Sequence, residues 1–121
     1  MARTIIPKKT FDITQTATSG ITILNSNITN LENASTRRAG NLIIATLIFT
    51  VSTAITNDQE PLFSGFPPAI GYTRFRCPSG TDGTKPDLVL SISTDGIIRN
   101  QWSTGGIGVG QWQCQFMYFT N

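Results

Sequence analysis

The side chains best suited to contact a polar ligand are few, and they lie in the second half of the chain. An aromatic face combined with hydrogen bonds from Arg, Asp, Asn or Gln side chains is the arrangement that holds a sugar. Trp102 stands after a strand-like run and beside the turn-rich sequence STGG. Arg74 and Arg76 share one face of a predicted strand, and Asp82 and Asp87 lie in the connector that follows. These five residues are the candidate ligand contacts.

Each candidate also has a structural interpretation. Trp102 suits half-buried packing as well as ligand contact. Arg74 and Arg76 suit a solvated face or ion pairs at an interface. The spacing of these residues leaves both interpretations open.

Catalytic chemistry is poorly represented in the sequence. The chain has no histidine, which removes the commonest general base and the commonest zinc ligand. The carboxylate pairs Asp58 with Glu60 and Asp82 with Asp87 lie in turn-rich segments, where Asp is favoured for local backbone reasons. The glycine-rich residues 105–110 precede a strand and open no helix, so they do not predict a nucleotide site. We therefore expect no catalysis, no metal and no cofactor.

The bulk composition predicts one all-β domain. The 121 residues are 39% hydrophobic and only 13% charged, and Thr, Ser, Asn and Gly are abundant. A net charge of +2 is too small to indicate a nucleic-acid partner. The longest apolar run, residues 42–49, has eight residues and is too short to span a membrane. The N-terminal sequence MARTIIPKKTF lacks the pattern of a signal peptide.

Several segments read as strands. YTRFRC (residues 72–77) alternates in polarity, and QWQCQFMYF (residues 111–119) places its large aromatic residues on one face. DLVLSIS and IIRNQW flank TDG, residues 94–96, which predicts a hairpin. Short strands separated by Gly- and Pro-rich turns predict an antiparallel sandwich or barrel.

The segment NLIIATLIFTVSTAI, residues 41–55, is apolar on both faces in its first half. Ile43 and Leu47 lie on one face, whereas Leu42, Ile44 and Ile48 lie on the other. A packed second sheet covers only one face. We therefore expect the N-terminal arm or another subunit to cover the second.

The segment ITILNSNITNLENAS, residues 21–35, carries a different pattern. Ile21, Leu24, Ile28 and Leu31 follow one another at spacings of three, four and three, which is typical of a heptad repeat. The pattern predicts a short helical stalk that packs against copies of itself. A helix or loop that lies on the domain remains the alternative, because two heptads are few.

Two further features concern packing. QEPLFSGFPPAIG, residues 59–71, combines three prolines with four large apolar residues, so it fits neither a helix nor a central strand, nor an ordinary solvent loop. Cys77 and Cys114 each occupy an apolar face of a predicted strand. We expect buried free thiols, with a single disulfide as the alternative.

The order of these segments resembles a known family. RRAGNLIIATLIFTVSTAI, PLFSGFPPAIGYTRFRC, LVLSISTDGIIRNQ and GQWQCQFMYFTN follow one another as in the C-terminal head domain of receptor-binding proteins. These heads belong to the tails and baseplates of phages and prophages of Gram-positive bacteria, the lactococcal ones in particular. LFSGFPP, residues 62–68, is the most specific piece and is close to the LFSGLPKP of the family. The resemblance covers about residues 36–121.

The resemblance implies a fold, an assembly and a function. The fold would be a jelly-roll-like antiparallel β-sandwich with a short N-terminal arm and stalk, and the assembly a homotrimer. The head would bind a host cell-surface saccharide without catalysis, on a virion, attached to other tail or baseplate proteins. Leu62, Phe63 and Phe66 would plug one end of the core. The expected divisions are residues 1–20 as arm, 21–35 as stalk and 36–121 as head.

The expected subunit interface combines the second face of the long strand with the stalk. Its residues would be Leu42, Ile44, Ile48, Ile21, Leu24, Ile28 and Leu31. Family members differ at their saccharide sites, so the resemblance assigns no ligand residue. Two other functions remain open: a structural virion tip or decoration protein without saccharide affinity, and a C1q- or tumour-necrosis-factor-like trimer that binds proteins.

Overall fold

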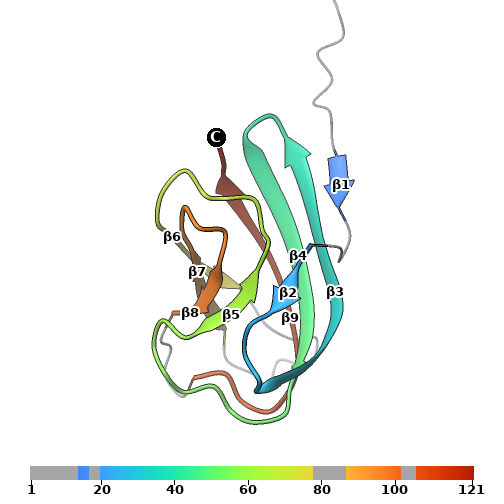
Figure 1. Cartoon of the computed structure of the whole chain (residues 1–121), viewed down its shortest axis with the longest axis vertical. Helices are drawn as coiled ribbons and strands as arrows, with labels where there is room; N and C mark the ends of the chain where they lie inside the picture. The colour runs from blue at the N-terminus through green and yellow to red at the C-terminus, as the bar shows by residue number, and fades with distance from the viewer. Residues whose placement is uncertain (1–13, 17–19, 78–86, 102–105) are drawn as a thin grey trace, which may run out of the picture.

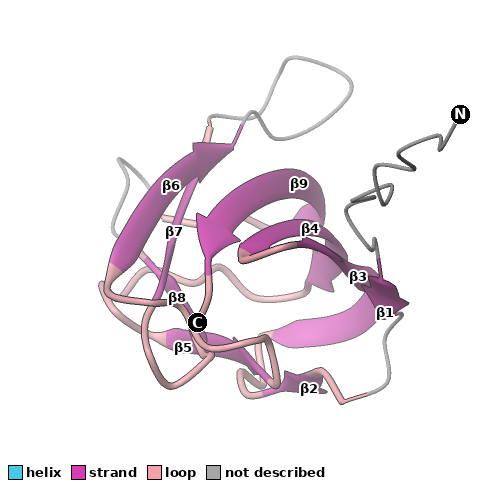
Figure 2. Cartoon of the chain, turned by 90° about the horizontal axis from the view of Figure 1, so that it is seen from above, coloured by secondary structure: helices cyan, strands magenta, loops and turns pink. Residues whose placement is uncertain are grey.

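The computed structural model describes residues 14–16, 20–77, 87–101 and 106–121. This part of the chain is all-β and contains no helix. It forms two antiparallel sheets that pack face to face (Figures 1 and 2), one with strand order β1-β3-β4-β9 and the other with order β2-β5-β8-β7-β6. The strands are β1 Thr14–Thr16, β2 Thr22–Ile23, β3 Ile28–Ala39, β4 Leu42–Val51, β5 Pro61–Ser64, β6 Thr73–Cys77, β7 Leu88–Ile92, β8 Ile98–Asn100 and β9 Gly110–Phe119. The prediction of an all-β antiparallel sandwich is confirmed, whereas jelly-roll connectivity and a trimer stay predictions.

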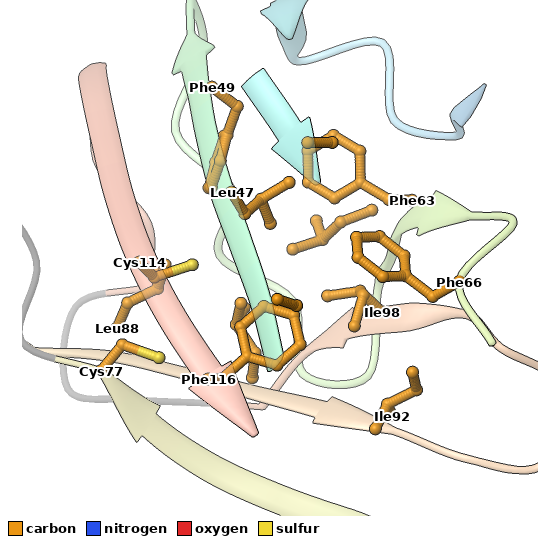
Figure 3. Close-up of a cluster of buried hydrophobic side chains, with 14 of the residues drawn as sticks. Leu47, Phe49, Phe63, Phe66, Cys77, Leu88, Ile92, Ile98, Cys114 and Phe116 are labelled. Atoms are coloured by element: carbon orange, nitrogen blue, oxygen red, sulfur yellow. The ribbon is translucent and has the colours of Figure 1, made fainter. Parts of the chain in front are cut away.

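The long strands follow their alternating sequences. Every second residue of β4 and of β9 is buried, so each strand has one core face and one outer face. The paired residues Phe49 and Trp112, like Leu47 and Cys114, project into the core. In the core, the Phe49 ring meets the Phe63 ring of the other sheet edge to face at 5.3 Å (Figure 3).

The helical prediction for residues 21–35 is wrong, because this segment contains β2 and most of β3. Two β-bulges interrupt β3, one between Ile28 and Asn30 and one between Leu31 and Asn33, and the first of them gives the spacing of three between Ile28 and Leu31. Each bulge inserts an extra residue and thereby shifts the facing of the strand by one. Ile28, Leu31 and Ala34 therefore all face the core at spacings of three, opposite Val51, Phe49 and Leu47 of β4. A bulged strand has here the spacing of a helix.

The proline-rich segment is half strand and half loop. Residues 61–64 form β5, with Pro61 at the first position, where a missing N–H is tolerated. Leu62, Phe63 and Phe66 are buried, as expected. Leu62 and Phe63 nevertheless belong to β5, which lies between β2 and β8, so the prediction that this segment does not fit a central strand is wrong for residues 61–64. Gly65 turns the chain out of β5 with φ of 94°, and a Cβ there would lie 1.8 Å from the Gly20 carbonyl oxygen.

The predicted TDG hairpin is also confirmed. β7 and β8 pair antiparallel, and the last pair before the turn is Ile92 with Ile98. Asp95 accepts a hydrogen bond from the Ile97 N–H at 3.0 Å, and Gly96 has φ of 71°. This turn brings β8 between β5 and β7.

Candidate functional site

Three of the five predicted ligand residues lie on one face, and the other two, Trp102 and Asp82, lie outside the described residues. Arg74 and Arg76 are exposed on β6, opposite Ser91 and Val89 of β7. Asp87 is exposed directly before β7. The core residues of β7 are Leu88, Leu90 and Ile92, so the alternation of the strand places Asp87 on the outer face of the second sheet, with the two arginines.

An exposed aromatic residue that the sequence did not single out lies on the same face. Tyr72 immediately precedes β6 and is 54% exposed. Its hydroxyl donates a hydrogen bond to Oε1 of Gln101, which directly follows β8. Nε2 of Gln59 donates to the same Oε1 at 2.7 Å and to the Tyr72 hydroxyl oxygen at 3.4 Å. Three segments far apart in the sequence thus meet in one polar cluster.

The side chains around the Tyr72 hydroxyl lower its pKa. The hydrogen bond from Gln59 is the main cause that lowers the pKa of Tyr72, and Ser91 and Arg74 contribute smaller effects. The hydroxyl therefore lies near side chains of β6 and β7 as well as near the end of β8. Ser91 is only 1% exposed although it faces outward. The Tyr72 side chain thus extends across the outer face of the second sheet. We call Gln59, Tyr72, Arg74 and Gln101 the Tyr72 surface.

A buried asparagine holds the segment that carries Gln59. The Asn100 side chain is fully buried, and its Nδ2 donates to the Asn57 carbonyl at 2.8 Å. The Asn100 N–H donates to the Glu60 carbonyl at 2.9 Å, and the Asn100 carbonyl accepts from the Gln59 N–H at 2.7 Å. Three hydrogen bonds thus hold residues 57–60 against β8.

The backbone of Gln59 is unusual. It has φ of 62°, and it is the only non-glycine residue with positive φ in the described part of the chain. Such a conformation costs about 1–3 kcal/mol for a non-glycine residue and persists where the surroundings enforce it. Here the hydrogen bonds to Asn100 enforce it, and the Gln59 amide is held against Tyr72 and Gln101. Asn100 Oδ1 has no hydrogen-bond partner among the described residues.

A third arginine lies on this face. Arg99 of β8 is opposite Ser91, which is in turn opposite Arg74, so the two arginines flank Ser91 in the strand register. Arg99 forms an ion pair with Asp95 at 2.9 Å. The hydrogen bond from Arg99 is the main cause that lowers the pKa of Asp95. Among the described residues, no ion pair involves Arg74 or Arg76.

The predicted interface residues are distributed unevenly. Leu42, Ile44 and Ile48 are partly exposed on the outer face of β4. Ile28 is buried in the core of its own chain, where no neighbouring subunit can reach it. The remaining three lie outside the buried core. Ile21 and Leu31 are partly buried and pack against it, and Leu24 is exposed.

The outer face of β4 continues onto β9. Leu42 pairs with Phe119 and Ile44 with Met117, and both β9 residues are 60% exposed. We define the β4–β9 outer face by its alternating residues. They are Leu42, Ile44, Thr46, Ile48, Thr50, Gln111, Gln113, Gln115, Met117 and Phe119. None of these ten is charged, although Arg37 of β3 pairs with Ile44 and Glu32 of β3 accepts a hydrogen bond from Thr50. The sequence reasoning had missed the contribution of β9.

Groups of three or more His, Cys, Asp or Glu side chains that could hold a metal ion are absent from the described residues. No helix in this part of the chain is long and apolar enough to cross a membrane. No known family model matches the sequence, and no curated protein matches it either. The resemblance to phage receptor-binding heads therefore stays a prediction.

Proposed function

We propose that the chain is the head of a phage tail or baseplate receptor-binding protein, and that its Tyr72 surface binds a host cell-surface saccharide without catalysis. The observation that carries the proposal is an exposed aromatic ring among side chains that make directed hydrogen bonds. Sugars stack their C–H faces on such rings and exchange hydrogen bonds through their hydroxyls.

Each residue of the Tyr72 surface has a role in this proposal. The Tyr72 ring is the stacking platform, Arg74 is a donor, and the Gln59 and Gln101 amides offer both donors and acceptors. Asn100 positions Gln59 through the backbone of residues 57–60. Because the amides are already held in place, little side-chain entropy is lost when a sugar binds.

The β4–β9 outer face supports a trimer. Two copies of a chain with net charge +2 repel one another, so a contact between copies favours a face whose own side chains carry no charge. The exposed Met117 and Phe119 side chains, beside Leu42 and Ile44, supply apolar area for such a contact. Three sites on one particle tip would bind a repeating polysaccharide more tightly than one.

The test combines an array of bacterial cell-surface saccharides with two truncations on opposite faces. Tyr72→Ala is expected to lower saccharide binding at least tenfold and leave the solution mass unchanged. Phe119→Glu is expected to reduce the mass by light scattering from three times 13.2 kDa to the monomer value. Val109, 64% exposed, gives matched controls: Val109→Ala and Val109→Glu should change neither quantity.

Two outcomes would contradict parts of the proposal. Full saccharide binding by Tyr72→Ala would remove the Tyr72 surface as the site. A stable trimer that binds no saccharide on the array would favour the structural alternative, a virion tip or decoration protein, which the charge-free β4–β9 outer face would serve equally well.

A further inference from the structure

The two cysteines lie together where the edges of the two sheets meet. Cys77 is the last residue of β6, and Cys114 is in the middle of β9. β6 ends the second sheet, and β9 ends the first. Figure 3 shows the two side chains beside each other, one from each strand. Both residues are buried with free thiols, as the sequence predicted.

An aromatic stack fixes the register between these two edges. The Phe75 and Phe116 rings lie parallel, with centroids 4.2 Å apart and an interplanar angle of 7°. Phe75 is two residues before Cys77, and Phe116 is two residues after Cys114. The stacked pair therefore places the two cysteines opposite one another.

A hydrogen bond completes the arrangement. The Cys77 thiol donates to the Gln115 carbonyl at 3.5 Å, next to Cys114 in the chain. The interaction with the Cys114 side chain is the main cause that lowers the pKa of Cys77, and the interaction with Cys77, together with burial, raises the pKa of Cys114. A thiol must ionise before it attacks an oxidant, and the lowered pKa favours Cys77 in that role.

We propose that Cys77 and Cys114 form a disulfide under oxidising conditions and thereby join the two sheets covalently. The oxidant is a peroxide, with hydrogen peroxide as the smallest member of that class. The Cys77 thiolate attacks one peroxide oxygen and breaks the O–O bond, which yields a sulfenic acid and hydroxide. The Cys114 thiolate then attacks the Cys77 sulfur and displaces the second oxygen as hydroxide. The two thiol protons convert both hydroxides to water, so two thiols are oxidised by two electrons and one peroxide becomes two water molecules.

The bond would link two sheet edges that are joined by side-chain packing and not by strand pairing. β6 and β9 share no ladder of paired residues, and the crosslink would close a loop that contains β7 and β8. Closing a loop of this size lowers the entropy of the unfolded chain and raises the thermal midpoint by about 10 °C. The inference is independent of saccharide binding.

The experiment uses the whole purified chain with and without hydrogen peroxide. We expect a loss of two hydrogen atoms in the intact mass, a peptide that links Cys77 to Cys114 in a non-reducing digest, and a thermal midpoint raised by about 10 °C. Dithiothreitol should reverse all three. Cys77→Ala and Cys114→Ala, which are apolar replacements for buried thiols, should show none of them.

A second arm removes the question of access to the buried thiols. The chain is unfolded in urea and refolded in the presence of peroxide, so the thiols meet the oxidant before burial. Formation of the link in either arm supports the proposal. Crosslinks between chains, oxygen added without a link, or two free thiols in both arms would overturn it.

Discussion

Asn100→Asp is the sharpest test of how the Tyr72 surface is positioned. The change replaces one amide nitrogen by oxygen at a fully buried site, with almost no change in volume. It removes the donor to the Asn57 carbonyl and places a carboxylate there instead. The Oδ1 position already lacks a partner among the described residues, so no known donor is available to stabilise the charge.

The expected cost follows from these two losses. A lost hydrogen bond costs about 1 kcal/mol, and an uncompensated buried charge raises the total to about 3–5 kcal/mol. That is a large part of the stability of a domain of this size. In urea unfolding followed by circular dichroism, it corresponds to a midpoint lowered by about 2 M.

The sign of the pH dependence gives a second check. Burial raises the pKa of such a carboxyl in the folded state, so the folded state binds more protons than the unfolded state. Stability of the variant relative to wild type therefore falls as pH rises, from about pH 4, the ordinary Asp value, through the raised folded pKa. Below that window the neutral acid can again donate to the Asn57 carbonyl.

Asn41→Asp is the matched control, because Asn41 is exposed in the β3–β4 turn. It should stay within about 0.5 kcal/mol of wild type at every pH. An Asn100→Asp variant as stable as Asn41→Asp at pH 7 would refute the assigned role of Asn100. Saccharide binding by Asn100→Asp, measured where it is still folded, should fall because residues 57–60, which include Gln59, lose one of the three hydrogen bonds that hold them.

Three further changes test the packing and the electrostatics. Gly65→Ala should cost about 2–4 kcal/mol in urea unfolding, because φ of 94° and a neighbouring carbonyl oxygen leave no room for a Cβ. Gly71→Ala, where a Cβ would have nothing within 4 Å, should be close to neutral. Equal effects of the two changes on stability would contradict this explanation. Tyr118→Phe should cost about 1 kcal/mol at neutral pH, because the phenol loses its 2.9 Å hydrogen bond to a proline carbonyl. Burial raises the pKa of Tyr118, so the stability that this group contributes in the wild type should be present below about pH 10 and be lost as pH rises further. Equal loss of stability in the wild type and in Tyr118→Phe during an alkaline titration would contradict this prediction. Asp95→Asn should cost less than about 0.5 kcal/mol at pH 7, because the pair with Arg99 is well exposed. The stability that the pair contributes, present above about pH 4, should be lost as pH drops through the lowered folded pKa of Asp95. A cost above about 1 kcal/mol would show that the pair is stronger than its exposure suggests.

The failed prediction for residues 21–35 has a specific physical origin. Spacings of three between apolar residues arise in a helix from its 3.6-residue turn, and they arise in a strand when a bulge adds one residue to a step of two. The sequence contains no mark that separates these two cases over so short a segment. Pairing with β4 decides between them, because Val51, Phe49 and Leu47 offer a core face that Ile28, Leu31 and Ala34 can join.

The candidate site was predicted in part for a similar reason. The outward placement of Arg74 and Arg76 follows from alternation within a single strand, which is a local property. The cluster of Tyr72 with Gln59 and Gln101 joins residues that are 13, 29 and 42 positions apart. No periodicity within one segment can bring such residues together.

The sequence by itself therefore determined what depends on neighbours in the chain. The alternation of β4, β6 and β9, the Asp-Gly turn and the burial of the two cysteines all follow from the period of two along a strand and from turn chemistry. Only the tertiary structure decided the bulges of β3, the left-handed backbone of Gln59 and the contact between Cys77 and Cys114. Each of these depends on hydrogen bonds and packing between strands whose adjacency is a property of the whole sandwich.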